Sequence, residues 1–242
     1  MINKSFVSTQ RAIKYVSESL SGLEFAHNRG IIHRNIKTAN IMLMNDSPKI
    51  SDFGLSVPTK TVLKEELMYI LHTPCEIFID GNVNAQTDIF AMGMTLYRIV
   101  NNVNDWDNIC DNIPNCSSLI ENGTLINKLP FSPHIPNSIK RIVKKACAKD
   151  IEKRFKTSAE FRNALERLNP YIDWIKINEK QWIGIGFQNS KKYTAYLENK
   201  RKGCRFIFKI NNRSVSAETK DFCTESEGIK YLLEYISKTT FK

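Results

Sequence analysis

The spacing of apolar residues predicts that the first part of the chain is helical. Between residues 9 and 29, apolar side chains from Ile13 to Ala26 recur at intervals of three and four, which places them on one helix face. Gly30 follows directly and favours the end of that helix. Three further helices are predicted at 85–101, where apolar residues occupy nearly all sides, and near 136–149 and 157–168.

Strand patterns are short in this first part. Ile41–Met44 and Lys49–Ser51 are predicted as two strands around a turn at residues 45–48. Residues 55–75 mix polar and apolar positions without a period, so we expect mostly loop there.

The composition shifts after Asn169-Pro170 toward strand-forming residues. Tyr193–Glu198 and Cys204–Ile210 alternate as the two arms of a hairpin would. Thr224 and Glu227 then form a capping box ahead of helically spaced apolar residues. We therefore expect two domains, 1–169 and 170–242, the second a small basic α+β domain of strands followed by one helix.

Composition limits the class of protein. The chain has 242 residues, 42% of them hydrophobic, which is enough for a packed core. Its net charge of +10 suits acidic partners, although a charge surplus spread over a solvated surface gives the same sum. The six cysteines form no C-x-x-C pair, so reduced thiols in a cytosol are expected. Without a membrane-length apolar run or a signal peptide, the sequence favours a soluble cytoplasmic protein with no membrane partner.

The sharpest chemical signal lies at residues 33–54. This stretch begins with H-R-N-I-K-T-A-N and ends with D-F-G, and it resembles the catalytic loop and metal-binding triplet of protein kinases. Similar matches follow in the family's order at Pro74-Cys75-Glu76, at Thr87–Tyr97 and at Asp150–Phe155. Residues 9 to about 168 thus resemble the C-terminal lobe of a eukaryotic-type (Hanks-type) Ser/Thr protein kinase. The implied fold is mainly α, with a short β-hairpin at the catalytic loop.

The resemblance assigns roles to individual residues. Asn40 and Asp52 would be the Mg²⁺ ligands, and Lys37 would neutralise charge on the transferring phosphoryl group. Those three residues and Met42 would contact ATP, and Asn35 and Lys37 occupy the catalytic positions. Asp88 would hold the catalytic loop backbone, and Glu76 would pair with Arg154. The remaining structural positions are His33, Arg34, Phe53 and Gly54.

Two departures from the family pattern bear on activity. Asn35 stands where the family has an aspartate that accepts or orients the substrate hydroxyl proton, and an amide oxygen is a poor base. The family's glycine-rich loop and V-A-I-K strand do not precede the catalytic loop in this sequence, and the G-I-G-F at 184–187 is no substitute. We expect that this chain alone does not build the ATP cleft. If the chain is an enzyme, one hypothesis is that a separate polypeptide supplies the small lobe.

The segment between D-F-G and P-C-E contains three candidate phosphorylation sites. A phosphate on Thr59, Thr61 or Thr73 would pair with Arg34 or other basic groups. Threonines are also common in unmodified surface loops, and the sequence favours that simpler interpretation.

Three functional hypotheses follow from different classes. The first is an impaired protein kinase acting on protein hydroxyls with ATP and Mg²⁺, and the second is a pseudokinase that binds a regulatory protein, or a truncated remnant. The third is nucleic-acid binding through Lys200–Lys202 and nearby aromatic residues such as Tyr193 and Phe206. A solvated turn above a small aromatic core explains the same residues, and the alternating pattern favours it.

Overall fold

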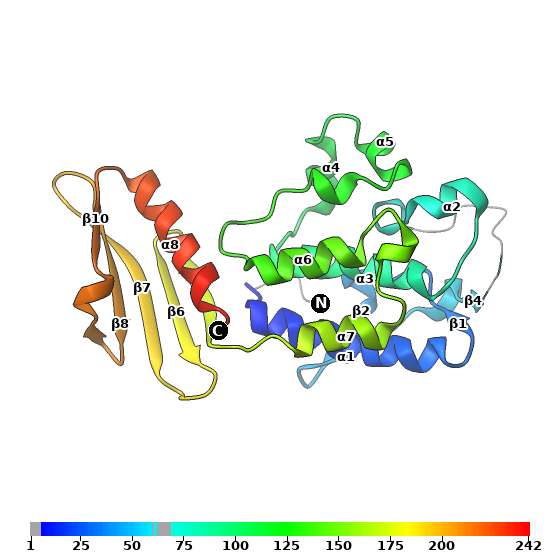
Figure 1. Ribbon diagram of the computed structural model, residues 1–242, viewed down its shortest axis with the longest axis horizontal. Coiled ribbons are helices and arrows are strands. Elements are labelled where there is room, and N and C mark those ends of the chain that lie inside the picture. Colours follow the sequence, from blue (N-terminus) through cyan, green and yellow to red (C-terminus); the bar gives the residue numbers. More distant parts are fainter. Residues whose placement is uncertain (1–5, 60, 62–68) are drawn as a thin grey trace. The chain divides into compact units, whose positions relative to one another are not determined.

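The structure, a computed structural model, describes residues 6–59, 61 and 69–242 (Figure 1). Contacts between residues divide the chain into two compact units. The first contains Ala12–Pro130 and Ser138–Arg167, and the second contains Phe6–Arg11, Phe131–Asn137 and Leu168–Lys242. The division at 167/168 lies close to the boundary that the composition suggests, but two short segments from the first part of the sequence cluster with the second unit.

Helices dominate the first unit (Figure 1). The central helix is α3 (Ala85–Val100), whose residues from Thr87 to Val100 are all buried. Its predicted bounds are confirmed, as are those of the other predicted helices to within a few residues. The elements of this unit are α1 (Thr9–His27), β1 (Ile31–Ile32), β2 (Ile41–Met44), β3 (Ser47–Ile50), β4 (Val57–Pro58), α2 (Cys75–Asp80), α3, α4 (Trp106–Asp111), α5 (Cys116–Glu121), α6 (Asn137–Ala146) and α7 (Ser158–Glu166).

The hairpin of β2 and β3 turns more tightly than the sequence predicts. Only Asn45 and Asp46 form the turn, both with positive φ, 51° and 61°, and Met44 pairs directly with Ser47. The predicted turn at 45–48 is therefore wrong at its second half. A two-residue turn with two left-handed residues matches the twist of the strands, and Asn and Asp tolerate that conformation.

Two other expectations need correction. The predicted loop at 55–75 contains β4, which pairs with β1, and a short 3₁₀ turn at Ile70–His72, while residues 60 and 62–68 lie outside the described residues. Cys110 and Cys116 form a disulfide, so the expectation of reduced thiols is wrong for this pair. The end of α4 and the start of α5 bring their Cα atoms to 5.8 Å, a proximity that sequence spacing alone does not reveal.

The second unit is built on an antiparallel sheet in the order β10-β8-β7-β6-β5, with β9 added beside β8. The predicted hairpin of β7 and β8 and the capping box of α8 are confirmed. Four strands, β5, β6, β9 and β10, were not located by the sequence patterns, and Gly184 and Gly186 of the G-I-G-F sequence lie in β6. The bounds are β5 (Ile172–Asn178), β6 (Gln181–Gly186), β7 (Lys192–Asn199), β8 (Cys204–Ile210), β9 (Arg213–Ser214), β10 (Lys220–Phe222) and α8 (Glu225–Thr239).

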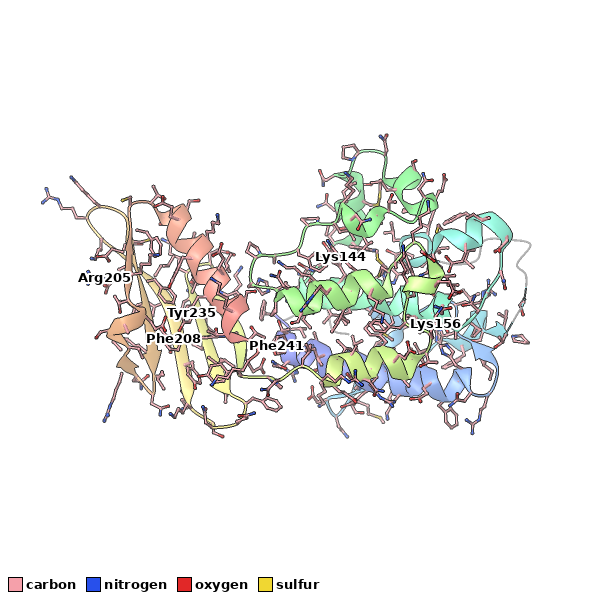
Figure 2. All side chains as sticks on the ribbon, in the orientation of Figure 1. Lys144, Lys156, Arg205, Phe208, Tyr235 and Phe241 are labelled. Carbon is pink, nitrogen blue, oxygen red and sulfur yellow. A yellow bond between two sulfur atoms is a disulfide. The ribbon has the colours of Figure 1, made fainter. Side chains whose placement is uncertain are left out.

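Aromatic side chains fill the core between α8 and the sheet. Trp182 and Phe206 are fully buried, and Phe208 lies with its ring centroid 5.1 Å from that of Tyr235 on α8 (Figure 2). Gly184 allows this packing, since a Cβ there would lie 2.5 Å from the Cγ2 atom of Ile172. The description "mainly α" therefore fits the first unit only. No helix among the described residues is long and apolar enough to cross a lipid bilayer.

Candidate functional site

A fully buried carboxylate on α3 holds the loop between β1 and β2. Asp88 accepts hydrogen bonds from the backbone N–H of His33 and of Arg34, both at 2.8 Å. This is the contact that the resemblance predicts for Asp88. Nε2 of His27, at the end of α1, also lies 2.8 Å from the carboxylate. Sequence reasoning missed His27, because a lone histidine in a last helical turn is an ordinary feature.

The ring of His33 connects this loop to the segment before the D-F-G triplet. The ring is buried, and its Nε2 donates to the carbonyl of Ser51 at 3.0 Å while Nδ1 accepts from the N–H of Asn35 at 3.2 Å. Phe53 packs against the same ring, with centroids 4.5 Å apart, yet 46% of Phe53 is exposed. His33 thus packs inside the unit, and Phe53 contacts it with one side of its ring.

Three of the predicted site residues meet at one carboxylate. Nδ2 of Asn35 donates to Oδ2 of Asp52 at 3.2 Å, and Nδ2 of Asn40 lies 3.3 Å from the same oxygen. Asp52 itself has a left-handed backbone, with φ 62° and ψ 65°. Lys37 lies on the same loop with Nζ 5.1 Å from the ring centroid of Tyr69, and Met42 is 58% exposed on β2.

The oxygen atoms of Asp52 and Asn40 are of the types that bind a magnesium ion. Nδ2 of Asn40 also donates to the carbonyl of Asn35 at 2.8 Å, so its amide oxygen takes part in none of these bonds. A carboxylate and an amide oxygen are hard ligands, which Mg²⁺ prefers, together with water and phosphate oxygens. Asp52 and Asn40 thus supply the ligand types that a Mg²⁺ site uses, and in this conformation the amide nitrogen of Asn40 faces the carboxylate.

Arg34 is a buried cation with hydrogen-bond donors that the described residues leave unsatisfied. It has φ 70° and is 6% exposed, and its Nη1 donates to the carbonyl of Leu55 at 3.0 Å. Its Nε and Nη2 are buried without a hydrogen-bond partner among the described residues. Burial lowers the pKa of Arg34, and the charge of Asp88 opposes that effect. Such a group would gain from a nearby anion.

The three candidate phosphorylation sites differ in accessibility. Thr59 is exposed, and Thr61 is partly exposed with its hydroxyl donating to the carbonyl of Pro58 at 2.6 Å. Thr73 is 4% exposed and its hydroxyl donates to the carbonyl of Tyr69 at 3.1 Å. In this conformation Thr73 is therefore enclosed, whereas Thr59 is open to solvent.

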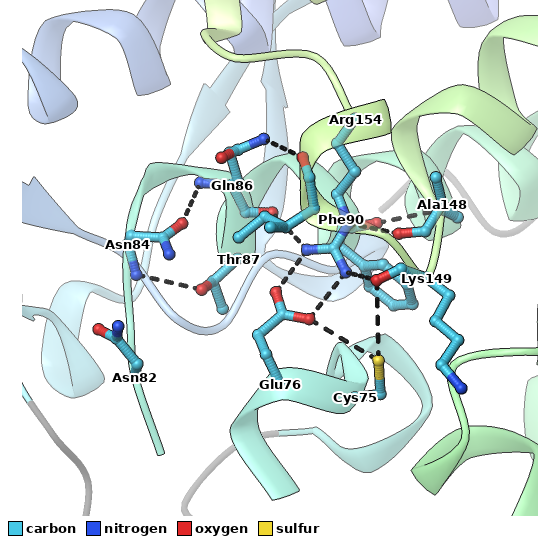
Figure 3. Close-up of polar contacts among 12 residues, drawn as sticks. Cys75, Glu76, Asn82, Asn84, Gln86, Thr87, Phe90, Ala148, Lys149 and Arg154 are labelled. Carbon is cyan, nitrogen blue, oxygen red and sulfur yellow. Dashed lines mark hydrogen bonds and ion pairs between the residues drawn. The ribbon is translucent and has the colours of Figure 1, made fainter. Parts of the chain in front are cut away.

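The predicted pair of Glu76 and Arg154 is present and bidentate (Figure 3). Nη1 of Arg154 lies 2.5 Å from Oε1 of Glu76, and Nη2 lies 2.8 Å from Oε2. Nε of Arg154 donates to the carbonyl of Ala148 at 2.6 Å. The arginine side chain is fully buried, so it joins the start of α2 to the segment after α6 from inside the unit.

Part of the positive charge at the basic hairpin of the second unit is paired within that unit. Lys200 pairs with Asp221 at 2.8 Å, and Arg205 (Figure 2) pairs with the same carboxylate at 2.7 Å. These partners, Arg205 first and Lys200 next, hold the pKa of Asp221 well below its usual range. Tyr193 and Phe206 are buried under α8, so neither ring is free to stack on a base.

Comparison with known proteins gives a consistent result for the first part of the chain. A family model described as "Protein kinase domain" matches residues 1–166. The chain is 25% identical over 154 residues to the probable serine/threonine-protein kinase PknB of Lactococcus lactis, which covers 62% of this chain and 24% of that protein. It is 29% identical over 171 residues to the serine/threonine-protein kinase PknB of Mycobacterium leprae, covering 66% of this chain and 26% of that protein. It is 26% identical over 203 residues to CBL-interacting protein kinase 10 of Oryza sativa, covering 78% of this chain and 38% of that protein. The chain thus spans about a quarter of the length of the two bacterial relatives.

Proposed function

The chain belongs to the protein kinase family, and on this premise we propose that it is a Ser/Thr-type member that binds Mg²⁺ and ATP but transfers phosphoryl groups slowly or not at all. Its substrates would be hydroxyl groups of proteins. If transfer is absent, the same surfaces would serve a pseudokinase that binds a regulatory protein partner.

One observation carries the proposal. Nδ2 of Asn35 donates to Asp52 at the position where the family's general base would accept a proton. An amide that is already a donor to the metal-binding carboxylate cannot take a proton from a substrate hydroxyl. Loss of a positioned general base costs about 10²–10⁴-fold in rate. Asn35 therefore supports the placement of Asp52 but leaves the proton-transfer step unaided.

Both residues that the resemblance assigns to the metal are present in this chain. Asn40 and Asp52 would hold Mg²⁺, which when bound neutralises charge on the phosphate oxygens. Met42, Met44 and Phe53 are 58%, 61% and 46% exposed, an apolar surface beside this site. We propose that a small lobe bearing the glycine-rich loop and the strand lysine, which do not occur ahead of the catalytic loop in this sequence, covers that surface.

Isothermal titration of the full chain with ATP and MgCl₂ tests the nucleotide half of the proposal. With a small-lobe polypeptide that binds the chain present, we expect magnesium-dependent binding that Asp52→Ala abolishes and that Asp111→Ala, at an exposed aspartate at the end of α4, leaves unchanged. If no binding is seen under these conditions, or if Asp52→Ala binds as the unaltered chain does, the proposed metal site is ruled out.

Transfer of radiolabelled phosphate from ATP to casein tests the catalytic half. The Asn35→Asp variant, together with any small-lobe polypeptide that binds the chain, should label casein about 10²-fold faster than the unaltered chain. Equal labelling by both, abolished in each by Asp52→Ala, would show that Asn35 does not impair the enzyme.

A further inference from the structure

A pocket of about 600 Å³ opens in the first unit beside the pair of Glu76 and Arg154. Its floor is formed by Cys75, Ile126 and Cys147, which are 3%, 4% and 0% exposed. None of the roles assigned to the catalytic loop involves these residues. The pocket is thus a concave feature that phosphoryl transfer does not explain.

The floor of this pocket is apolar because both of its thiols stay neutral. Burial raises the pKa of Cys75 and of Cys147 well above the ordinary thiol value. Gly123 keeps the floor open, since it has φ +65° and a Cβ there would lie 2.7 Å from Sγ of Cys75. An apolar side chain is the ligand group that such a floor favours.

The rim of the pocket carries uncompensated positive charge. Glu76 is engaged by Arg154, and Asp150 lies 3.5 Å from Nζ of Lys153. The other two lysines that line the pocket, Lys144 and Lys149, are exposed and pair with no carboxylate in the part of the chain that the structure describes. The rim therefore suits a ligand with negative charge on both sides of its apolar group.

Contacts from Arg154 and Cys75 hold the backbone carbonyl of Lys149, as Figure 3 shows. Arg154 donates to the carbonyl of Ala148 at 2.6 Å and to that of Lys149 at 3.5 Å. The thiol of Cys75 lies 3.9 Å from the same Lys149 carbonyl. Because the backbone is held in place, a ligand that pairs with Lys149 would order only the lysine side chain.

We propose that this pocket docks a protein partner through a short segment in which an apolar side chain is flanked by carboxylates. The apolar side chain enters between Ile126 and Cys147, and the carboxylates pair with Lys144 and Lys149. Ile79, which is 77% exposed at the rim, adds an apolar contact. Docking of this kind does not require phosphoryl transfer, so it holds for an active or an inactive member of the family.

Fluorescence anisotropy with the full chain and a labelled peptide, Glu-Glu-Phe-Glu-Glu, tests the proposal. We expect saturable binding that weakens with added salt, and no comparable binding of Lys-Lys-Phe-Lys-Lys or Glu-Glu-Ser-Glu-Glu. Binding of the basic or the serine peptide with equal affinity would contradict the proposal, as would no binding of the first peptide at millimolar concentration.

Two sets of variants locate the binding. Lys144→Glu and Lys149→Glu should each weaken it at least about fivefold, the factor for one exposed ion pair of ~1 kcal/mol. Arg141→Glu makes the same charge change on α6 outside the pocket lining and should change the affinity less than twofold. Equal losses in Arg141→Glu would show general electrostatic attraction and overturn the assignment.

The apolar contact is tested at a position that folding does not need. Ile79→Asp should weaken peptide binding, whereas Ile177→Asp, at a residue 51% exposed on β5 of the second unit, should not. Circular dichroism checks that both variants are folded. If labelled laurate binds in a Lys149-dependent manner and the peptide does not, the pocket takes anionic amphiphiles and the protein-docking proposal is wrong.

Discussion

Replacing Arg154 with alanine removes the central connection of the first unit. The guanidinium is fully buried and bonds to Glu76, to the carbonyls of Ala148 and Lys149, and, at 3.4 Å, to the carbonyl of Gln86. In Arg154→Ala the Glu76 carboxylate keeps its charge without a partner, and the Ala148 carbonyl loses its donor. The perturbation is therefore larger than the loss of one salt bridge.

The expected cost follows from burial. Removing one partner of a buried ion pair destabilises a protein by about 3–5 kcal/mol. The Glu76 side chain retains 16% exposure, so water can reach the stranded carboxylate, and we take the lower end, about 3 kcal/mol. With a urea m-value of about 2 kcal/mol/M, the unfolding midpoint would fall by about 1.5 M.

Urea unfolding followed by far-UV circular dichroism measures this shift. Lys156→Ala serves as the matched control, because Lys156 pairs with Glu152 at the surface with 44% of its side chain exposed, a contact expected to contribute less than about 1 kcal/mol. Arg154→Lys should fall between the two, since a lysine keeps the charge but lacks the bidentate fork. If Arg154→Ala and Lys156→Ala shift the midpoint equally, the buried pair does not stabilise the unit as argued.

Two further predictions concern a buried histidine and a buried tryptophan. Burial lowers the pKa of His72 from 6.5 to about 3. Between these two pH values the unfolded chain binds a proton at His72 and the folded chain does not. The free energy of unfolding should therefore fall as the pH drops from about 6.5 toward 3, by at most about 1.4 kcal/mol per pH unit. The Ile36 carbonyl lies 2.9 Å from Nδ1 of His72, and the amide of a His72→Asn variant can still donate to it. This variant should lose less stability between pH 7 and pH 5 in urea unfolding than the unaltered chain. An equal loss of stability in both proteins would show that His72 is not the cause. Trp182→Ala should destabilise the second unit by about 3–5 kcal/mol, because Trp182 is fully buried with its ring 5.3 Å from that of Phe6. Limited proteolysis of the second unit reads out this change, and a similar effect from Ile185→Ala, at a residue 57% exposed, would contradict the packing argument.

Sequence patterns predicted those features that depend on local periodicity or on an ordered set of motifs. The apolar spacing in α1, the all-round apolar α3 and the capping box of α8 each determine a helix from nearby residues alone. The motif order likewise indicated that Asp88 and the catalytic loop would meet, although 55 residues separate Asp88 from His33.

Features that depend on unmarked long-range contacts were not predictable. His27 reaches Asp88 across 61 residues, and nothing in its local sequence distinguishes it from a surface histidine. Thr73 looks like any loop threonine until its hydroxyl is seen to donate to the Tyr69 carbonyl inside the unit. Pro48 suggested a turn, yet it occupies a strand in a two-stranded hairpin, where a missing N–H can be tolerated on an outer edge.

The contacts of Asp88 and of Asn35 show that folding constrains these two motif residues to different degrees. Substitution of Asp88 would leave the buried N–H groups of His33 and Arg34 without their hydrogen-bond acceptor. Such a substitution would destabilise the fold, so selection would act against it whether or not the chain is an enzyme. Asn35 is 8% exposed and, among the described residues, its side chain makes one hydrogen bond, to a carboxylate that is itself exposed, so its exchange would disturb folding less than that of Asp88. Folding alone therefore constrains Asp88 more tightly than Asn35.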